Sequence, residues 1–276
     1  MRYLWLASFP RSGNTFFRNV LFHVYGIDSI EDESYSIENT KSKLIVIKTH
    51  NLPSLVNNYS KELDKVIYLV RDGRDAICSI AFKRKNLIAP SSDLFVNFQE
   101  ATYAPRGIHF GGWASNCRLW MAENPIIIRF EDLVSDPRKT FEEIEKHVTL
   151  PVANWDELPD FKKQKKGETK FGSAGGQHAE IKNFSEVFFR QGKVGGWKTE
   201  MPLELQSYFW TKSKKIMLAL GYQENGEVKK MEPLKIEAIK NEHFYNSFVL
   251  FANMFWSDKS PYVRFKKYIK SIILNQ

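Results

Sequence analysis

The chain has 276 residues, of which 43% are apolar and 26% charged, and its 40 Lys and Arg against 32 Asp and Glu give a formal net charge of +8. These values are ordinary for a globular protein and exclude a disordered, collagen-like or coiled-coil chain. Its two cysteines, Cys78 and Cys117, cannot build a disulfide framework or a four-ligand metal site, which indicates a reducing compartment. The positive charge predicts an anionic partner and leaves nucleic acid, a membrane and a phosphorylated small molecule open.

The apolar stretches are short. Met1–Ser8 is too short for a signal peptide, and a polar segment follows at once. No run of about 18 apolar residues appears, so we expect no membrane-spanning helix and a cytoplasmic protein.

Short apolar runs alternate with helical patterns. Tyr3–Ala7 is continuously apolar, as in a strand buried on both faces, and Thr15–Tyr25 has helical spacing that ends at Gly26. Further strands are predicted at 44–49, 65–70 and 125–130, and further helices at 52–59, 74–85, 137–148 and 201–220. This order predicts an α/β fold with a central parallel sheet flanked by helices on both faces.

Two stretches interrupt the alternation and are long enough to be functional lids: the loop-rich, aromatic Leu87–Gly112 and the Lys- and Gly-rich Lys162–Gly196. We expect one domain over residues 1–222 and a C-terminal helical extension, 223–276, that packs on this domain or covers it. The end of the extension, Tyr262–Gln276, is basic on one side and apolar on the other. A helix packed on the domain is the favoured interpretation, and a membrane-surface helix is the alternative.

The segment Phe9–Thr15 joins the first strand to the first helix. A loop in this position aims backbone N–H groups and a helix N-terminus at its ligand, which suits a phosphate. The segment lacks the Gly-Lys-Ser/Thr ending of the ATP-binding loop, and Arg11 supplies the cation instead. Alone, it is equally compatible with a plain turn that carries a surface arginine.

A second group ends the next predicted strand. Lys48 and His50 are two residues apart, so they point to the same side of the strand. A cation beside a near-neutral base can orient an anionic group and deprotonate an acceptor. A strand-end histidine more often only caps a loop, so this hypothesis depends on the neighbouring motifs.

A third group follows the third predicted strand. Arg71 closes the strand, and Ser79 lies about one helical turn beyond Asp75, so Arg71 and Ser79 can converge on one anion. Arg74 and Asp75 are expected to form an exposed ion pair and a charge at the helix start.

Three later segments complete a pattern. In order, they are Gly111-Gly112-Trp113 with Trp120, Arg129-Phe130-Glu131-Asp132-Leu133 with Asp136-Pro137, and FRQGKVGGWK at 189–198. With the three earlier groups, they resemble the cytosolic and bacterial-type sulfotransferases that use 3′-phosphoadenosine-5′-phosphosulfate (PAPS), over residues 3–222. The resemblance implies a P-loop-like fold.

The resemblance also implies roles for individual residues. The 5′-phosphosulfate would be held by Arg11, Ser12, Gly13, Asn14 and Thr15. Aromatic contacts to the nucleotide would come from Phe16 and Phe130. The 3′-phosphate would lie near Arg71, Ser79, Arg190, Gln191 and Gly192. The catalytic residues would be His50 as general base, Lys48 against the sulfuryl oxygens and Arg11 on the leaving phosphate.

The chain departs from the family pattern at several positions. Arg11 stands where animal members usually have Lys, and an arginine cannot give up its proton. Asn116 stands where many phenol-sulfating members have His, which makes a simple phenol a less secure substrate. The dimerisation pattern that follows the last Trp of the family is not kept after Lys198, so the oligomeric state stays open.

The resulting hypothesis is sulfuryl transfer from PAPS to a hydroxyl or an amine or amide nitrogen of a small molecule, with specialised metabolites among the candidates. It requires no metal and no nucleic acid, because Lys and Arg can balance the charge of a sulfuryl group. Two alternatives are a nucleotide or small-molecule kinase and a non-catalytic protein that binds anions or a membrane surface.

Overall fold

The computed structural model describes residues 3–32, 44–172 and 192–231 and contains the predicted parallel sheet. Its five strands run in the order β2-β3-β1-β4-β5, and every pairing is parallel. The strands are β1 (Leu4–Ala7), β2 (Ser29–Glu31), β3 (Val46–Thr49), β4 (Lys65–Val70) and β5 (Ile126–Arg129). Of these strands, β2 alone was not predicted, because its three residues are too few to show a period.

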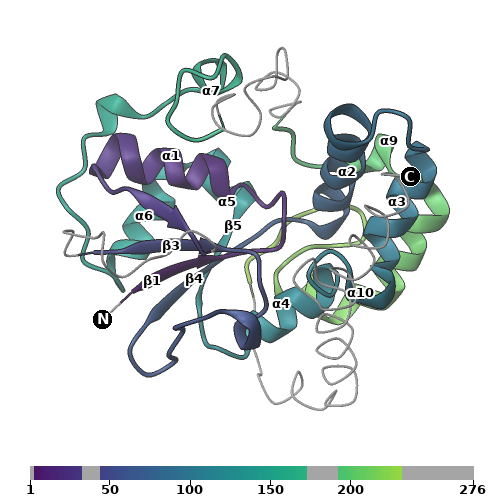
Figure 1. Ribbon diagram of the computed structural model, residues 1–276, viewed down its shortest axis with the longest axis horizontal. Helices are drawn as coiled ribbons and strands as arrows, with labels where there is room; N and C mark the ends of the chain where they lie inside the picture. The colour runs from purple at the N-terminus through teal and green to yellow at the C-terminus, as the bar shows by residue number, and fades with distance from the viewer. Residues whose placement is uncertain (1–2, 33–43, 173–191, 232–276) are drawn as a thin grey trace, which may run out of the picture.

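Helices cover both faces of the sheet, as predicted (Figure 1). Strand alternation sends Trp5 to one core and its neighbours Leu4 and Leu6 to the other. The Leu4 side packs against α1 (Asn14–Tyr25), α5 (Phe130–Ser135) and α6 (Pro137–Glu145). The Trp5 side packs against α2 (Gly73–Lys83), α3 (Leu94–Tyr103), α4 (Trp113–Met121), α9 (Trp197–Glu200) and α10 (Leu203–Ala219).

The register places the ends of β1 and β3 level with each other, and β4 continues two residues beyond them. Ala7, the last residue of β1, pairs with Thr49 at the end of β3 and with Tyr68 of β4. The chain leaves β1 toward β2 and β3 on one side and reaches β4 and β5 on the other. Ligands of open parallel sheets collect at such a switch point, beyond the carboxyl ends of the strands.

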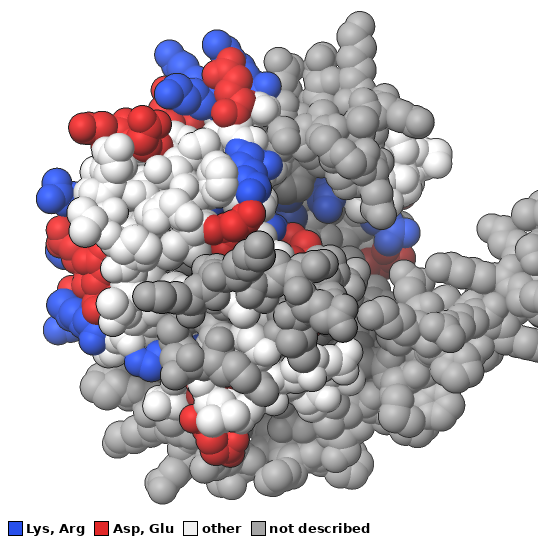
Figure 2. Space-filling model, turned by 60° about the vertical axis from the view of Figure 1, so that its left-hand side comes forward, with Lys and Arg blue, Asp and Glu red and all other residues white. Residues whose placement is uncertain are grey.

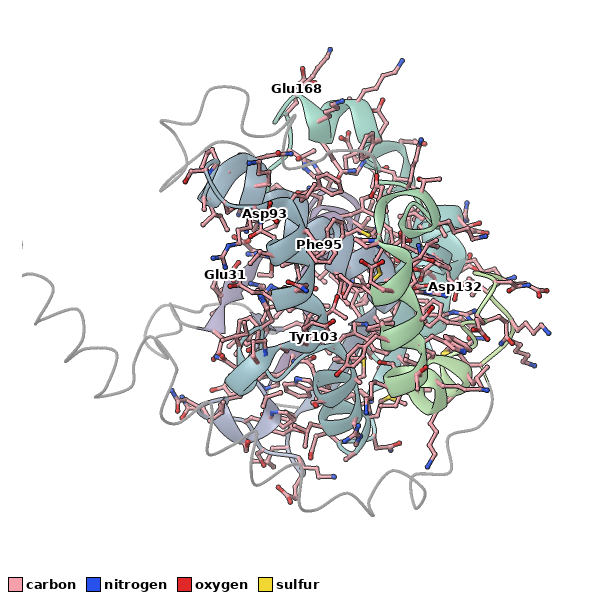
Figure 3. All side chains as sticks on the ribbon, turned by 90° about the vertical axis from the view of Figure 1, so that its right-hand side faces the viewer. Glu31, Asp93, Phe95, Tyr103, Asp132 and Glu168 are labelled. Atoms are coloured by element: carbon pink, nitrogen blue, oxygen red, sulfur yellow. The ribbon has the colours of Figure 1, made fainter. Side chains whose placement is uncertain are left out.

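The segment expected to be a loop-rich lid, 87–112, is largely helical. A π-helical turn at Arg84–Ile88 extends α2, and α3 and a 3₁₀ turn at Pro105–Gly107 follow. The Asp93 side chain accepts a hydrogen bond from Val96 N and so begins α3. Figure 3 shows Asp93 and Tyr103 at the two ends of this helix.

Other bounds differ slightly from the prediction. The expected helix at 52–59 is a single 3₁₀ turn, Pro53–Leu55, and Phe130 begins α5 instead of ending a strand. Two further short elements are the 3₁₀ turn Trp155–Glu157 and the helix α7 (Phe161–Lys165).

Residues 221–231 pack against the domain through Tyr222, Gln223 and Glu224. Tyr222 forms an isolated antiparallel bridge with Val228, and its hydroxyl donates to Glu131 Oε2 at 2.8 Å. The rest of the expected C-terminal extension lies outside the described residues, so the division at residue 222 stays a prediction. Within the described ranges, no helix combines the length and apolar character that crossing a bilayer requires.

Candidate active site

The loop after β1 and the start of α1 form an anion-binding backbone. Arg11 and Gly13 have left-handed φ angles of 68° and 102°, and no side chain caps the first N–H groups of α1. A Cβ at Gly13 would overlap the Phe130 ring, with Cε2 3.0 Å away and Cδ2 closer. Only glycine therefore combines this turn with the close approach of Phe130. The helix N-terminus and its backbone N–H groups favour a negative ligand here.

Unsatisfied polar atoms gather in the same region. Ser12 Oγ, Asn14 Oδ1 and Arg71 Nε are buried and have no hydrogen-bond partner among the described residues. The other end of the Asn14 amide is engaged, because Nδ2 donates to Ser8 Oγ at 2.8 Å. A buried polar atom without a partner costs about 1–3 kcal/mol, so these atoms point to a bound group that satisfies them. A hydroxyl and a guanidinium N–H both suit a phosphate oxygen.

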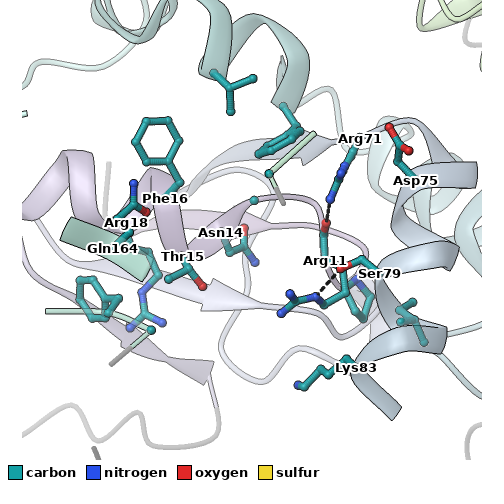
Figure 4. A pocket seen from close by; sticks show the side chains of 18 of the residues that line it. Arg11, Asn14, Thr15, Phe16, Arg18, Arg71, Asp75, Ser79, Lys83 and Gln164 are labelled. Carbon is teal, nitrogen blue, oxygen red and sulfur yellow. Dashed lines mark hydrogen bonds between the residues drawn. The ribbon is translucent and has the colours of Figure 1, made fainter. Parts of the chain in front are cut away.

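Arg11 and Arg71 link the loop to its neighbours (Figure 4). Arg11 Nε donates to Ser79 Oγ at 2.9 Å, and Arg71 donates to Arg11 O at 3.3 Å. The second Arg71 terminal nitrogen donates to Lys193 O at 2.8 Å, and its guanidinium lies 4.5 Å from the centre of the Phe130 ring. Arg71 and Ser79 therefore both contact Arg11, and their convergence on one anion stays a prediction.

His50 is a half-buried base with a defined tautomer. Its Nδ1 lies 2.9 Å from Ser8 O, and a carbonyl can only accept, so Nδ1 carries the proton and Nε2 is the basic nitrogen. Burial, followed by the positive charge of Lys48, lowers the pKa of His50 well below its usual value. The imidazole is therefore neutral near pH 7 and able to accept a proton.

Lys48 is held by an acidic partner, Glu31, that was not predicted from the sequence. Its Nζ donates to Glu31 Oε2 at 2.7 Å, and the other oxygen of Glu31 accepts from Arg18. Arg18 lies one turn beyond Asn14 on α1, and it is buried. Because residues four apart lie on the same face of a helix, the spacing from Asn14 to Arg18 could have predicted that Arg18 lies near the phosphate loop.

The expectation of an exposed ion pair at Arg74 and Asp75 is wrong. Arg74 is 1% exposed and binds Asp72 through two nitrogens, at 3.0 and 2.7 Å. Its guanidinium also stacks on Trp197 at 3.6 Å. Asp75 is 3% exposed and accepts from Gly195 N at 2.7 Å and from Trp197 N at 2.9 Å. Both side chains anchor the segment that follows residue 191, which brings Gly192 and Lys193 to the site.

One cavity of about 1230 Å³ joins these groups. Figure 2 shows Lys and Arg side chains, in blue, inside a hollow of the surface. The predicted residues that line the cavity are Arg11, Gly13, Asn14, Thr15, Phe16, Lys48, His50, Arg71, Ser79, Phe130 and Gly192. Ser12, within the same loop, is buried. Arg190 and Gln191 lie outside the described residues. Asn116 is fully buried and bonds Tyr68 and the carbonyl of His50, so it supports the base and does not line the cavity.

Comparisons with known proteins agree with this geometry. Among curated proteins, an 85-residue stretch is 31% identical to the 3-alpha-hydroxysteroid sulfotransferase of Cavia porcellus, a match that spans 29% of each chain. A mouse sulfotransferase complexed with PAP has a similar fold, with a TM-score of 0.60 and 16% identity over 77% of this chain and 84% of that one. Retinol dehydratase, in complex with androsterone and PAP, gives a TM-score of 0.54 and 15% identity over 78% of this chain and 80% of its own.

The model of one protein family matches most of the chain. It is the sulfotransferase domain, and the match covers residues 2–221, which include the loop after β1, the ends of β3 and β4 and the start of α2. The chain belongs to the sulfotransferase domain family.

Proposed function

We propose that this protein transfers a sulfuryl group from PAPS to a hydroxyl or nitrogen of a small-molecule acceptor. The observation that carries the proposal is the meeting, in one cavity, of a neutral, half-buried histidine with Lys48 and with the cationic loop after β1. The structural neighbours that were solved with PAP support a donor of this class.

The residues of the loop fit the donor. Ser12 and Arg71 offer buried N–H and O–H groups that lack partners among the described residues, and the N-terminus of α1 adds its backbone donors. Phe16 and Phe130 line the same cavity and offer apolar faces to a purine ring. When bound, PAPS supplies an activated sulfuryl group, whose transfer leaves 3′-phosphoadenosine 5′-phosphate (PAP).

The catalytic steps of the chain are proton transfer and charge stabilisation. His50 takes the acceptor proton at Nε2, while its Nδ1–H stays on Ser8 O and keeps the ring in place. Lys48 and Arg11 hold positive charge beside the base, where oxygen charge develops during transfer. A positioned base contributes roughly 10²–10⁴ in rate, and one charge-stabilising donor roughly 10²–10³.

The test is to incubate the protein with PAPS and a panel of alcohols, phenols and amines, and to score the mass gain of a sulfuryl group. His50→Ala should reduce turnover and leave the affinity for PAP nearly unchanged, whereas Arg71→Ala should weaken PAP binding. His147→Ala is the matched control, because this exposed histidine lies outside the cavity. A thermal shift with ATP and none with PAPS or PAP would overturn the proposal in favour of a kinase.

A further inference from the structure

Helix α2 runs along the cavity and carries a lysine beyond the nucleotide loop. Ser79 contacts Arg11, and Lys83 follows one helical turn later, which is about 6 Å along the axis. Both residues line the cavity. Figure 4 shows Arg71, Arg11 and Lys83 one after the other across the site, with Ser79 beside Arg11. Lys83 therefore lies on the side of Arg11 that is remote from Arg71.

The same cavity has apolar lining residues beside its charged ones. Ile80, which lies three residues before Lys83 on α2, lines the cavity together with Ile88 and Phe110, and the centre of the Phe110 ring lies 5.7 Å from that of His50. His109 and Phe110 both have left-handed φ angles, 51° and 55°, which non-glycine residues rarely adopt. Strain of this kind persists where the surrounding structure needs a side chain in one place. The segment thus holds Phe110 against the proposed base, at the position where an acceptor would meet it.

Lys83 is partly buried and lies among other positive charges, and both lower its pKa. Burial, followed by the charges of Arg11 and Lys48, lowers the pKa of Lys83 to about 8. His50 also faces this group, and the nearby Arg84 pairs with Glu100 at 2.7 Å. Adding a negative group at this place relieves the repulsion among the cations and restores the charged form of Lys83.

We propose that the acceptor is an amphiphilic monoanion, such as a hydroxylated carboxylic acid, whose carboxylate is bound by the Lys83 ammonium while its apolar body lies on Ile80, Ile88 and Phe110. This inference rests on the proposed function, because it names the acceptor of the same site. The Lys83 ammonium is a compact point charge that can pair with one carboxylate, and the two guanidiniums that can hold a phosphate through parallel bonds, Arg11 and Arg71, are at the nucleotide loop.

The experiment measures binding to the PAP-loaded protein. The probes are para-hydroxyphenylpropionate and omega-hydroxydecanoate, each beside its methyl ester, titrated by calorimetry at pH 7. The carboxylate of at least one pair should bind about 10-fold or more tightly than its ester, because a hydrogen bond to a charged group has about this strength. Lys83→Met should remove the preference, and Lys83→Arg should keep it. Lys215→Met, on the exposed face of α10, is the charge-matched control and should behave as the wild type.

The outcomes separate this inference from the proposed function. If PAP itself does not bind, the proposed function fails. If PAP binds but no carboxylate binds better than its ester, or if the preference survives in Lys83→Met, the inference is overturned while the proposed function stands. Circular dichroism and a retained thermal shift with PAP show that each variant is folded. In turnover with PAPS, the ratio of kcat/KM for acid and ester should follow the same pattern across the four proteins.

Discussion

Gly13→Ala should weaken nucleotide binding, because it strains the backbone of the binding loop and displaces the Phe130 ring. Gly13 has a φ of 102°, and its missing Cβ leaves the space that the Phe130 ring occupies. An alanine there must adopt a left-handed backbone, which costs about 1–2 kcal/mol, and must displace the ring. Because the Arg71 guanidinium lies 4.5 Å from the centre of that ring, the displacement also moves a proposed phosphate ligand.

The opposite end of the same helix provides the control. Gly26 ends α1 with a φ of 65°, and a Cβ at this position would meet nothing within 4 Å. Gly26→Ala therefore has the backbone cost alone, about 1–2 kcal/mol, or ~2–8 °C in Tm. Gly13→Ala adds overpacking, which costs about 1–3 kcal/mol in a close-packed site. If about 2 kcal/mol of this total is the cost of returning the nucleotide-binding loop to its binding conformation, the affinity for PAP falls ~30-fold.

The assay is calorimetric titration of PAP into the wild type and both variants, with thermal unfolding of the unliganded proteins in parallel. Gly26→Ala should lose stability and keep its affinity for PAP, and Gly13→Ala should lose both. Equal affinity in the two variants would refute the reasoning, because it would mean that the close approach of Phe130 does not shape the binding loop.

Three further predictions concern His50, the buried charges and the segment after residue 191. The pKa of His50 is lowered well below its usual value of about 6.5, so the neutral form of the imidazole persists in mild acid. The acidic limb of a kcat/KM profile should therefore lie below pH 6.5. A limb at or above this pH would contradict the lowered pKa. Arg74→Met should lower the free energy of unfolding in urea by about 3–5 kcal/mol, because it leaves the buried Asp72 without its bidentate partner. The control Arg138→Met, on the surface of α6, should change this free energy by under about 0.5 kcal/mol. Asp75→Ala leaves the Gly195 and Trp197 N–H groups without their acceptor and should weaken PAP binding about 10-fold in the same titration; unchanged affinity would show that the segment is held by other contacts.

The sheet and the phosphate loop could be predicted because their signals are local. The strands at β1 and β4 are short runs of apolar residues, buried on both faces, that helical segments separate. The loop after β1 combines a small set of residues, Arg11 to Thr15, whose position between a strand and a helix already determines where the backbone donors point. The three-residue β2 and the helix inside 87–112 escaped prediction, since short or aromatic segments have no clear period.

The sequence by itself determined the fold class, the order of the motifs and the placement of Lys48, His50 and Arg71 at strand ends, because alternation and strand ends are properties of neighbouring residues. The tertiary structure alone decided which charges are buried. Arg74 reads as a surface residue until Gln223 and Glu224, some 150 residues away in sequence, cover it and accept its hydrogen bonds. The same holds for Lys83, whose neighbours Arg11 and Lys48 come from two other segments. Burial and electrostatic surroundings arise from contacts between distant segments, so no local pattern contains them.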